Sequence, residues 1–300
     1  MNVLETKLLG VTLKNPVIAA SGTFGFGEEY AEYIDVSRLG GISGKGLTLN
    51  GSCGNDGIRI VETPSGLMNS IGLENPGVEA FVKEKCAVMR SMNTAVIANM
   101  GGHSLEDYLQ GAAMLDKADI DILELNISCP NVKKGGMSFG TDPKTAGELV
   151  KQIKEITSKP LLVKLTPNAP DIISVAKACE ENGADGISLI NTLLGMAVDV
   201  KKRKAVFNNV YAGFSGPAIM PVALRIVHQV SHAVNIPIVG MGGIASAEDA
   251  LAFMMVGATA VQVGTATFAD PYAMIKIIDG LEEYAKQNGL SNINEIVGII

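Results

Sequence analysis

Eight short apolar runs recur along the 300-residue chain, and amphipathic segments separate most of them. The runs cover residues 17–20, 41–45, 95–99, 122–126, 161–165, 186–190, 237–240 and 260–263. Residues 145–157 and 172–182 are two of the amphipathic segments, and their pattern is that of helices. Alternating strands and helices indicate a parallel sheet, and eight such units predict an α/β fold closed into a (β/α)8 barrel.

The rest of the chain is expected to add a hairpin and two long loops to this barrel. Residues 4–13 alternate around Gly10, which predicts a small β-hairpin at the floor of the barrel. No linker or low-complexity segment interrupts the sequence, so we expect one domain over residues 1–300. Two connections, 46–93 and 191–221, are long. Loops that follow barrel strands build the active site, and long loops often act as lids.

Composition fits an aliphatic barrel and disfavours two other classes of protein. Hydrophobic residues make up 47% of the chain without a single tryptophan, so Val, Ile and Leu must fill the interior. The net charge is −7 and the basic run 201–204 is typical of a solvated loop, so we expect no nucleic-acid partner. Residues 250–269 carry no charge, but glycines favour helix, turn and strand over a membrane span. Without a signal-peptide pattern, we expect a cytoplasmic protein.

The four cysteines are spaced too widely for a local metal or iron–sulfur site, so no metal is expected. Cys86 and Cys179 fall on faces of predicted helices, where a thiol usually packs as a small hydrophobic group. Cys53 lies in a glycine-rich loop, and its role stays open. Cys129 follows the fourth strand, with Pro130 fixing the turn, and is interpreted as a reactive thiol. The three histidines give a hydrolytic triad little support.

Polar residues end or follow five of the predicted strands, where the active face of a barrel would lie. They are Lys45, Asn99, Asn126, Lys164 and the pair Asn191 and Thr192. A lysine beside a core strand is costly unless it meets an anion or an electron-rich group. Lys45 and Lys164 therefore predict an anionic ligand, such as a reduced flavin.

Glycine-rich turns end the last two strands, at residues 240–244 and 263–266. Barrels often bind phosphate with the loops after their seventh and eighth strands. Backbone N–H groups reach a phosphate there only where side chains are absent. These two turns therefore predict a phosphate group on the ligand.

Several motifs together resemble class 1 dihydroorotate dehydrogenases. They are NISCPN at 126–131, GGMSFG at 135–140, NSIGLENPG at 69–77, KLTPN at 164–168 and the NT pair at 191–192. The resemblance runs over essentially the whole chain, and the combination is specific although each motif alone is not. The cysteine in NISCPN and the lack of an N-terminal membrane helix are both expected of class 1.

The resemblance implies one FMN per chain and a set of ligand contacts. For FMN these are Ser21, Lys45, Gly46, Asn99, Asn126, Lys164, Ile190, Gly216, Gly242, Gly243, Gly264 and Thr265. For dihydroorotate they are Lys45, Asn69, Ser70, Ile71, Gly72, Leu73, Asn126, Asn131, Asn191 and Thr192. Cys129 would remove a proton from C5 while a hydride leaves C6 for the flavin on the opposite face.

Within class 1, the NVKKGGMSFG continuation resembles the NAD-linked type B catalytic subunit. That family implies oxidation of (S)-dihydroorotate to orotate in de novo pyrimidine biosynthesis, with electrons passing to NAD+. It also implies a partner subunit that carries FAD and a [2Fe–2S] cluster, in a 2+2 heterotetramer around a dimer of catalytic subunits.

Other interpretations remain open at this point. The chain could be the fumarate-linked homodimeric enzyme, or a dihydropyrimidine dehydrogenase-like flavoenzyme that shares an SCPN-like loop. Residues 69–77 disfavour the latter, because uracil has no carboxylate to hold. A non-redox aldolase or isomerase barrel that binds phosphate would instead use Lys164 to form a Schiff base. A catalytically silent scaffold is disfavoured by the polar strand ends.

Overall fold

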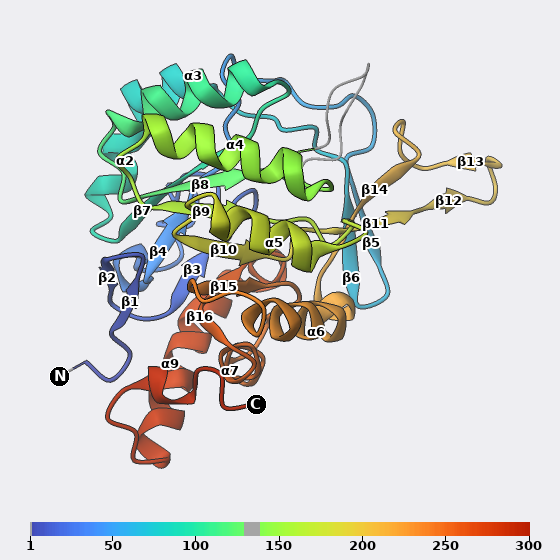
Figure 1. Ribbon diagram of the computed structural model, residues 1–300. Helices are drawn as coiled ribbons and strands as arrows, with labels where there is room; N and C mark the ends of the chain where they lie inside the picture. The colour runs from blue at the N-terminus through green and yellow to red at the C-terminus, as the bar shows by residue number, and fades with distance from the viewer. Residues whose placement is uncertain (1, 129–138) are drawn as a thin grey trace.

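The computed structural model describes residues 2–128 and 139–300, and its centre is a closed barrel of eight parallel strands (Figure 1). Around the barrel these are β3 Val17–Ala19, β4 Gly41–Ser43, β7 Ala95–Met100, β8 Ile122–Asn126, β9 Leu161–Lys164, β10 Gly186–Leu189, β15 Ile238–Met241 and β16 Ala258–Val263. All eight predicted strands are confirmed, with ends displaced by at most two residues. The (β/α)8 fold class is therefore correct.

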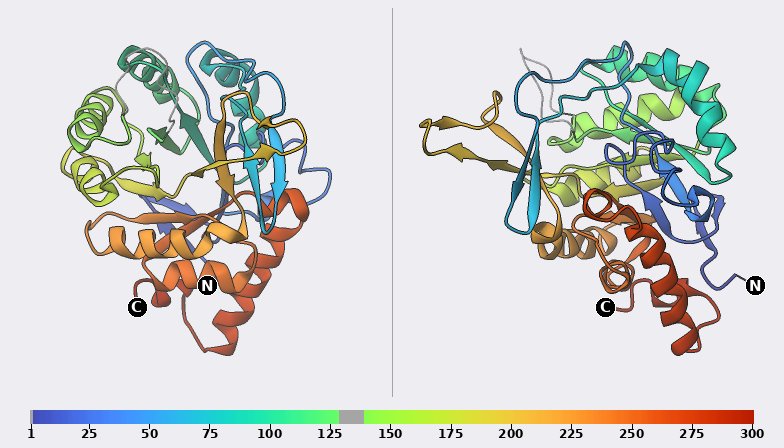
Figure 2. Two further views of the ribbon diagram at one scale, coloured as in Figure 1. Left: turned by 90° about the vertical axis from the view of Figure 1, so that its right-hand side faces the viewer. Right: turned by 180° about the vertical axis from the view of Figure 1, so that it is seen from behind.

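Helices surround the barrel, as the end-on view in Figure 2 shows. The longer ones are α2 Cys86–Ser91, α3 Leu105–Asp116, α4 Pro143–Ile156, α5 Ile172–Glu181, α6 Met220–Ser231, α7 Ala247–Met255 and α9 Ala273–Gln287. Local sequence sets their starts: Ser104 and Ser246 each form a capping box, and Asp142 caps α4 with proline next in the chain. The two predicted helices correspond to α4 and α5.

Short helical elements complete the helical part of the described chain. They are η1 Val36–Arg38, α1 Val78–Ala80, η2 Phe81–Lys85, η3 Pro217–Ile219, α8 Ala266–Ala269 and η4 Ile293–Ile296. Residues 250–269 form the end of α7, β16 and α8, as expected from their glycines. None of the helices in the described ranges is long and apolar enough to cross a membrane.

A hairpin closes the floor of the barrel. Strands β1 (Thr6–Leu8) and β2 (Val11–Leu13) pair antiparallel, and the chain turns at Gly10 with a φ of 83°. Leu8 and Leu13 are buried against a layer of barrel side chains that includes Ile18, Ile97, Ile122, Leu162, Val239 and Ala260. Each buried leucine stabilises the fold by roughly 1.5–3 kcal/mol. The predicted hairpin is confirmed.

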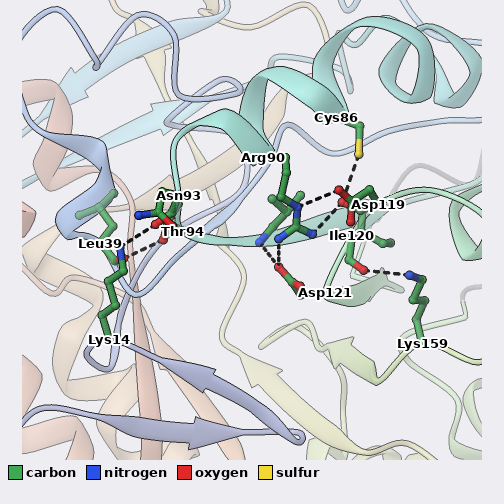
Figure 3. Close-up of polar contacts among 11 residues, drawn as sticks. Lys14, Leu39, Cys86, Arg90, Asn93, Thr94, Asp119, Ile120, Asp121 and Lys159 are labelled. Atoms are coloured by element: carbon green, nitrogen blue, oxygen red, sulfur yellow. Dashed lines mark hydrogen bonds and ion pairs between the residues drawn. The ribbon is translucent and has the colours of Figure 1, made fainter. Parts of the chain in front are cut away.

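Polar contacts fix the strand starts at the same end of the molecule (Figure 3). Asp121, just before β8, accepts from the Val96 backbone N–H at 2.7 Å and from Arg90 Nη1 at 2.9 Å. Arg90 also donates to the carbonyl of Asp119, which accepts from the Cys86 thiol. These contacts join α2 to β7 and β8. They lie at the amino end of the strands, where barrels keep residues for stability rather than chemistry.

A second sheet lies over the carboxyl ends of the barrel strands, and sequence analysis did not predict it. Its order is β11 Leu193–Met196, β14 Tyr211–Ser215, β6 Gly66–Asn69 and β5 Ile60–Thr63, all antiparallel. A small hairpin of β12 Val198–Asp199 and β13 Lys204–Ala205 projects beyond it (Figure 1). The sheet is built from the two long connections that were expected to be loops. Their expected place on the active face is confirmed.

Candidate active site

A cavity of about 880 Å³ opens at the carboxyl ends of the barrel strands. Its walls come from strand ends and from the second sheet, because Lys45, Lys164 and Gln262 line it together with Asn69 and Tyr211. Barrel enzymes place their active sites at this face. The cavity is therefore the candidate active site.

The floor of the cavity rests on a buried carboxylate in β8. Glu124 is fully buried, and its two oxygens accept four side-chain hydrogen bonds. Ser43 Oγ and Asn99 Nδ2 donate to Oε2 at 2.6 and 2.7 Å. Ser188 Oγ and Gln262 Nε2 donate to Oε1 at 2.7 and 2.9 Å. Strands β4, β7, β10 and β16 thus meet at this one group, directly above the apolar layer.

Two lysines bring positive charge to the cavity. Burial lowers the pKa of Lys164, which is only 4% exposed, and the negative charge of Glu124 opposes that effect. Burial also lowers the pKa of Lys45, while Glu74 at the cavity rim acts to raise it. Burial by itself would raise the pKa of Glu124, but Lys164 and the hydrogen bonds together hold it below its usual value. The site therefore pairs one buried anion with two cations that face the ligand space.

Amides are held in fixed orientations beside these charges. Asn126 donates from Nδ2 to Asn99 Oδ1 at 3.3 Å and accepts at Oδ1 from the Ser128 backbone N–H at 3.2 Å. Asn191 donates to the Ser128 hydroxyl, and the Tyr108 hydroxyl donates to the Asn126 carbonyl at 2.7 Å. Such a network offers a planar polar ligand both donors and acceptors.

Glycines with positive φ form one wall of the cavity. Gly216, Gly242 and Gly243 have φ values of 101°, 125° and 84°. A Cβ on Gly243 would lie 2.8 Å from the Gly216 carbonyl oxygen, so the two backbones approach each other closely. Thr265 Oγ1 donates to Ser215 Oγ at 2.9 Å and ties the loop after β16 to the same wall. Bare backbone in this position suits a phosphate.

The segment 69–73 starts at the last residue of β6 and also lines the cavity. Asn55 holds it with a backbone bond to the Ile71 carbonyl at 2.8 Å and side-chain bonds to the Ser70 carbonyl and hydroxyl, both at 3.1 Å. Gly72 fits because a Cβ there would lie 2.5 Å from the Asn55 side chain. Arg59 and Glu74 form an ion pair of 2.8 Å next to this segment.

The structure brings together nearly all of the residues that the sequence predicted for the two ligands. Every predicted flavin contact except Asn99 lines the cavity, and Asn99 lies beneath it in the hydrogen-bond network of Glu124. Every predicted substrate contact within the described residues lines the cavity too. The catalytic candidate Cys129 and the substrate contact Asn131 lie outside the described residues. Cys86 and Cys179 are buried, which confirms their packing role, and Cys53 is exposed.

Sequence analysis missed the residues of the floor: Ser43, Glu124, Ser188 and Gln262. The only signal was a polar side chain inside an otherwise apolar strand, as in the ILELN of β8. Inward and outward positions alternate along a strand, so Glu124 faces the interior together with Ile122 and Asn126. A charge at such a position predicts a buried polar network.

Comparisons with known proteins agree with this geometry. A family model described as dihydroorotate dehydrogenase matches residues 3–284. The chain is 52% identical over 300 residues to a protein of Petrotoga mobilis, covering 99% of this chain and 100% of that one. It is 54% identical over 296 residues to a protein of Desulforamulus reducens, covering 98% and 97%. Both relatives are named dihydroorotate dehydrogenase B (NAD(+)), catalytic subunit.

Proposed function

The chain belongs to the dihydroorotate dehydrogenase family, and on that premise we propose that it oxidises (S)-dihydroorotate to orotate with FMN bound in the cavity. The observation that carries this proposal is the cavity itself. It combines a glycine wall suited to phosphate, two partly or fully buried lysines and a set of fixed amides. We propose that residues 1–300 form one FMN-binding domain.

The residues of the cavity fit FMN. Gly216, Gly242 and Gly243 would hold the phosphate through their backbone, because no Cβ could be placed there without a clash. Lys164 and the buried amide of Gln262 would lie against the flavin ring. When bound, FMN supplies the acceptor for the hydride that leaves C6 of dihydroorotate. A fixed positive charge at Lys164 favours electron transfer to the ring.

The remaining polar residues would hold the substrate. Dihydroorotate carries a carboxylate and two ring N–H groups, so it needs a cation, N–H donors and acceptors. Lys45 supplies the cation, and Asn69 and Asn191 supply amides. Residues of the second sheet, such as Leu67, Leu193 and Tyr211, line the cavity and would limit the access of water to a bound substrate, which would strengthen each polar contact.

Cys129 is the proposed base that takes the proton from C5. Ser128, the preceding residue, lines the cavity. We expect Cys129→Ala to retain FMN while dihydroorotate oxidation falls by roughly 10²–10⁴-fold, the typical contribution of a positioned base. Cys53→Ala is the matched control, because Cys53 is exposed and should change neither property. Wild-type turnover in Cys129→Ala would remove the proposed base.

We also propose that the chain is the catalytic subunit of the NAD-linked form of the enzyme. Both relatives are named as catalytic subunits of an NAD(+) enzyme, which supports a separate partner subunit. We propose that this partner carries FAD and a [2Fe–2S] cluster in a 2+2 assembly, as the sequence resemblance implies. Free thiols such as that of Cys53 support a reducing, cytoplasmic location. Native purification followed by flavin and iron analysis tests this. The chain alone should reduce dyes but not NAD+, whereas efficient NAD+ or fumarate reduction by the chain alone would contradict the assignment.

A further inference from the structure

The buried charge in the middle of the barrel needs an explanation beyond stability. Glu124 is 0% exposed, and burying an ionised carboxylate costs several kcal/mol even after the structure relaxes. The layer below it is wholly apolar, as is usual in a barrel core. A valine or leucine would pack there without that cost. The charge is therefore placed directly under the cavity for a reason connected with the ligand.

One consequence of the carboxylate is the orientation of two amides. A carboxylate only accepts hydrogen bonds, so Asn99 and Gln262 must turn their NH2 groups toward Glu124. Their oxygens are then fixed on the other side. Asn99 Oδ1 accepts from Asn126. Gln262 Oε1 is buried and has no hydrogen-bond partner among the described residues, although Gln262 lines the cavity.

An unpaired buried acceptor at the edge of a cavity points to a ligand that donates a hydrogen bond. Leaving such an oxygen unsatisfied costs about 1–3 kcal/mol, so native structures seldom do so without a partner. The pyrimidine part of a flavin ring carries an N–H group that would satisfy Gln262 Oε1. The same carboxylate that fixes this amide also supplies negative charge to Lys164 on the neighbouring strand.

We propose that Glu124 is a positioning residue of the FMN site, which orients Gln262 so that Oε1 accepts from a flavin N–H and which places a buried negative charge on the strand next to that of Lys164. This inference rests on the proposed function, because it assumes that FMN is the ligand. Glu124 itself touches no ligand, since Gln262, Asn99 and Lys164 stand between it and the cavity. Gln262 is a further binding residue that the sequence analysis did not identify.

The test replaces the charge with an amide of the same shape. In the full-length chain, Glu124→Gln leaves the cavity volume unchanged but introduces an NH2 group that faces the donors of its neighbours. We expect the dissociation constant for FMN to rise by about tenfold, the effect of one lost hydrogen bond. Above the pH at which Lys164 of the variant loses its charge, the reduction potential of bound FMN should be more negative than in the wild-type chain, because the reduced flavin then lacks its cationic partner.

The pH dependence of FMN affinity distinguishes a positioning role of Glu124 from a purely structural one. Glu124, on the neighbouring strand, acts on the charge of Lys164. Among the described residues, the other charged side chains that line the cavity are Glu29, Lys45 and Glu74, and Arg59 pairs with Glu74 beside it. Without Glu124 the pKa of Lys164 falls further, so its charged form is lost at a lower pH. FMN affinity should therefore decline with rising pH earlier in Glu124→Gln than in the wild-type chain. A substitution that only loosened the fold would not shift this profile.

Two more variants complete the experiment. Gln262→Leu should weaken FMN binding by about tenfold but leave the pH profile in place, because Lys164 keeps its counter-ion. Glu155→Gln, on the exposed face of α4, should change nothing. Wild-type FMN affinity, potential and pH profile in Glu124→Gln would overturn the inference, as would wild-type affinity in Gln262→Leu if Glu124→Gln does not fold. Absence of FMN binding by the wild-type chain would instead refute the proposed function.

Discussion

Substituting Gly243 by alanine tests the phosphate wall of the cavity. Gly243 has a φ of 84°, where a residue with a Cβ pays about 1–2 kcal/mol. The new methyl group would also lie 2.8 Å from the Gly216 carbonyl oxygen and 2.8 Å from Met220 Cβ, so the two loops must move apart. Losing one charge-assisted hydrogen bond to the phosphate costs about 1.5–3 kcal/mol. The dissociation constant for FMN should then rise by roughly ten- to a hundredfold.

Gly10→Ala provides a matched control. Gly10 has a φ of 83° and nothing within 4 Å of a Cβ, and it lies in the floor hairpin. Both variants should therefore lose about 1–2 kcal/mol of stability from backbone strain. Only Gly243→Ala should lose FMN affinity. The assay titrates FMN into apoprotein and follows the quenching of its fluorescence, with thermal melts of both variants. Equal FMN affinity in the two variants would refute the assignment of this wall to the phosphate.

Three further predictions concern separate parts of the molecule. Because burial lowers the pKa of Lys45, this lysine loses its charge at a lower pH than an ordinary lysine, and the KM for dihydroorotate should begin to increase at that lower pH. A KM that does not change with pH would count against Lys45 as the cation that binds the substrate. Burial raises the pKa of Cys179 to about 12, so mass spectrometry after alkylation at neutral pH should find Cys53 modified and Cys179 intact. Alkylation of Cys179 in the folded chain would contradict its assignment as a buried, unreactive thiol. Asp121→Ala removes the hydrogen-bond acceptor for Val96 and Arg90, so the free energy of unfolding, measured by denaturant titration, should fall by about 1–3 kcal/mol. FMN affinity should stay unchanged, and a loss of affinity would mean that the two ends of the barrel are coupled.

The barrel could be predicted from the sequence because its signals are local. Each strand is a short apolar run, and each helix carries its own amphipathic pattern and cap, as Asp142 shows for α4. The second sheet escaped prediction because its strands are short and half exposed. Its central pairing joins Met68 to Phe214, and no local pattern reveals a partner so far along the chain.

The same distinction between local and long-range signals applies to the candidate site. Lys45, Asn126 and Lys164 lie at or near strand ends, which a parallel barrel must bring together. Their position in the sequence was therefore enough to predict that they line one site. The contacts of Glu124 depend on register around the whole barrel. Gln262 lies 138 residues from Glu124 along the chain, and only the closed sheet places them 2.9 Å apart. The sequence shows a charge inside a strand but not which groups meet it.

The most direct test of the central claim is an anaerobic mixing experiment with the FMN-loaded chain. If the cavity holds FMN and dihydroorotate together, dihydroorotate should bleach the flavin absorbance and yield one orotate per FMN, whereas dihydrouracil, which lacks the carboxylate, should leave the flavin oxidised. Unchanged absorbance after dihydroorotate, or equal bleaching by the two compounds, would contradict the account.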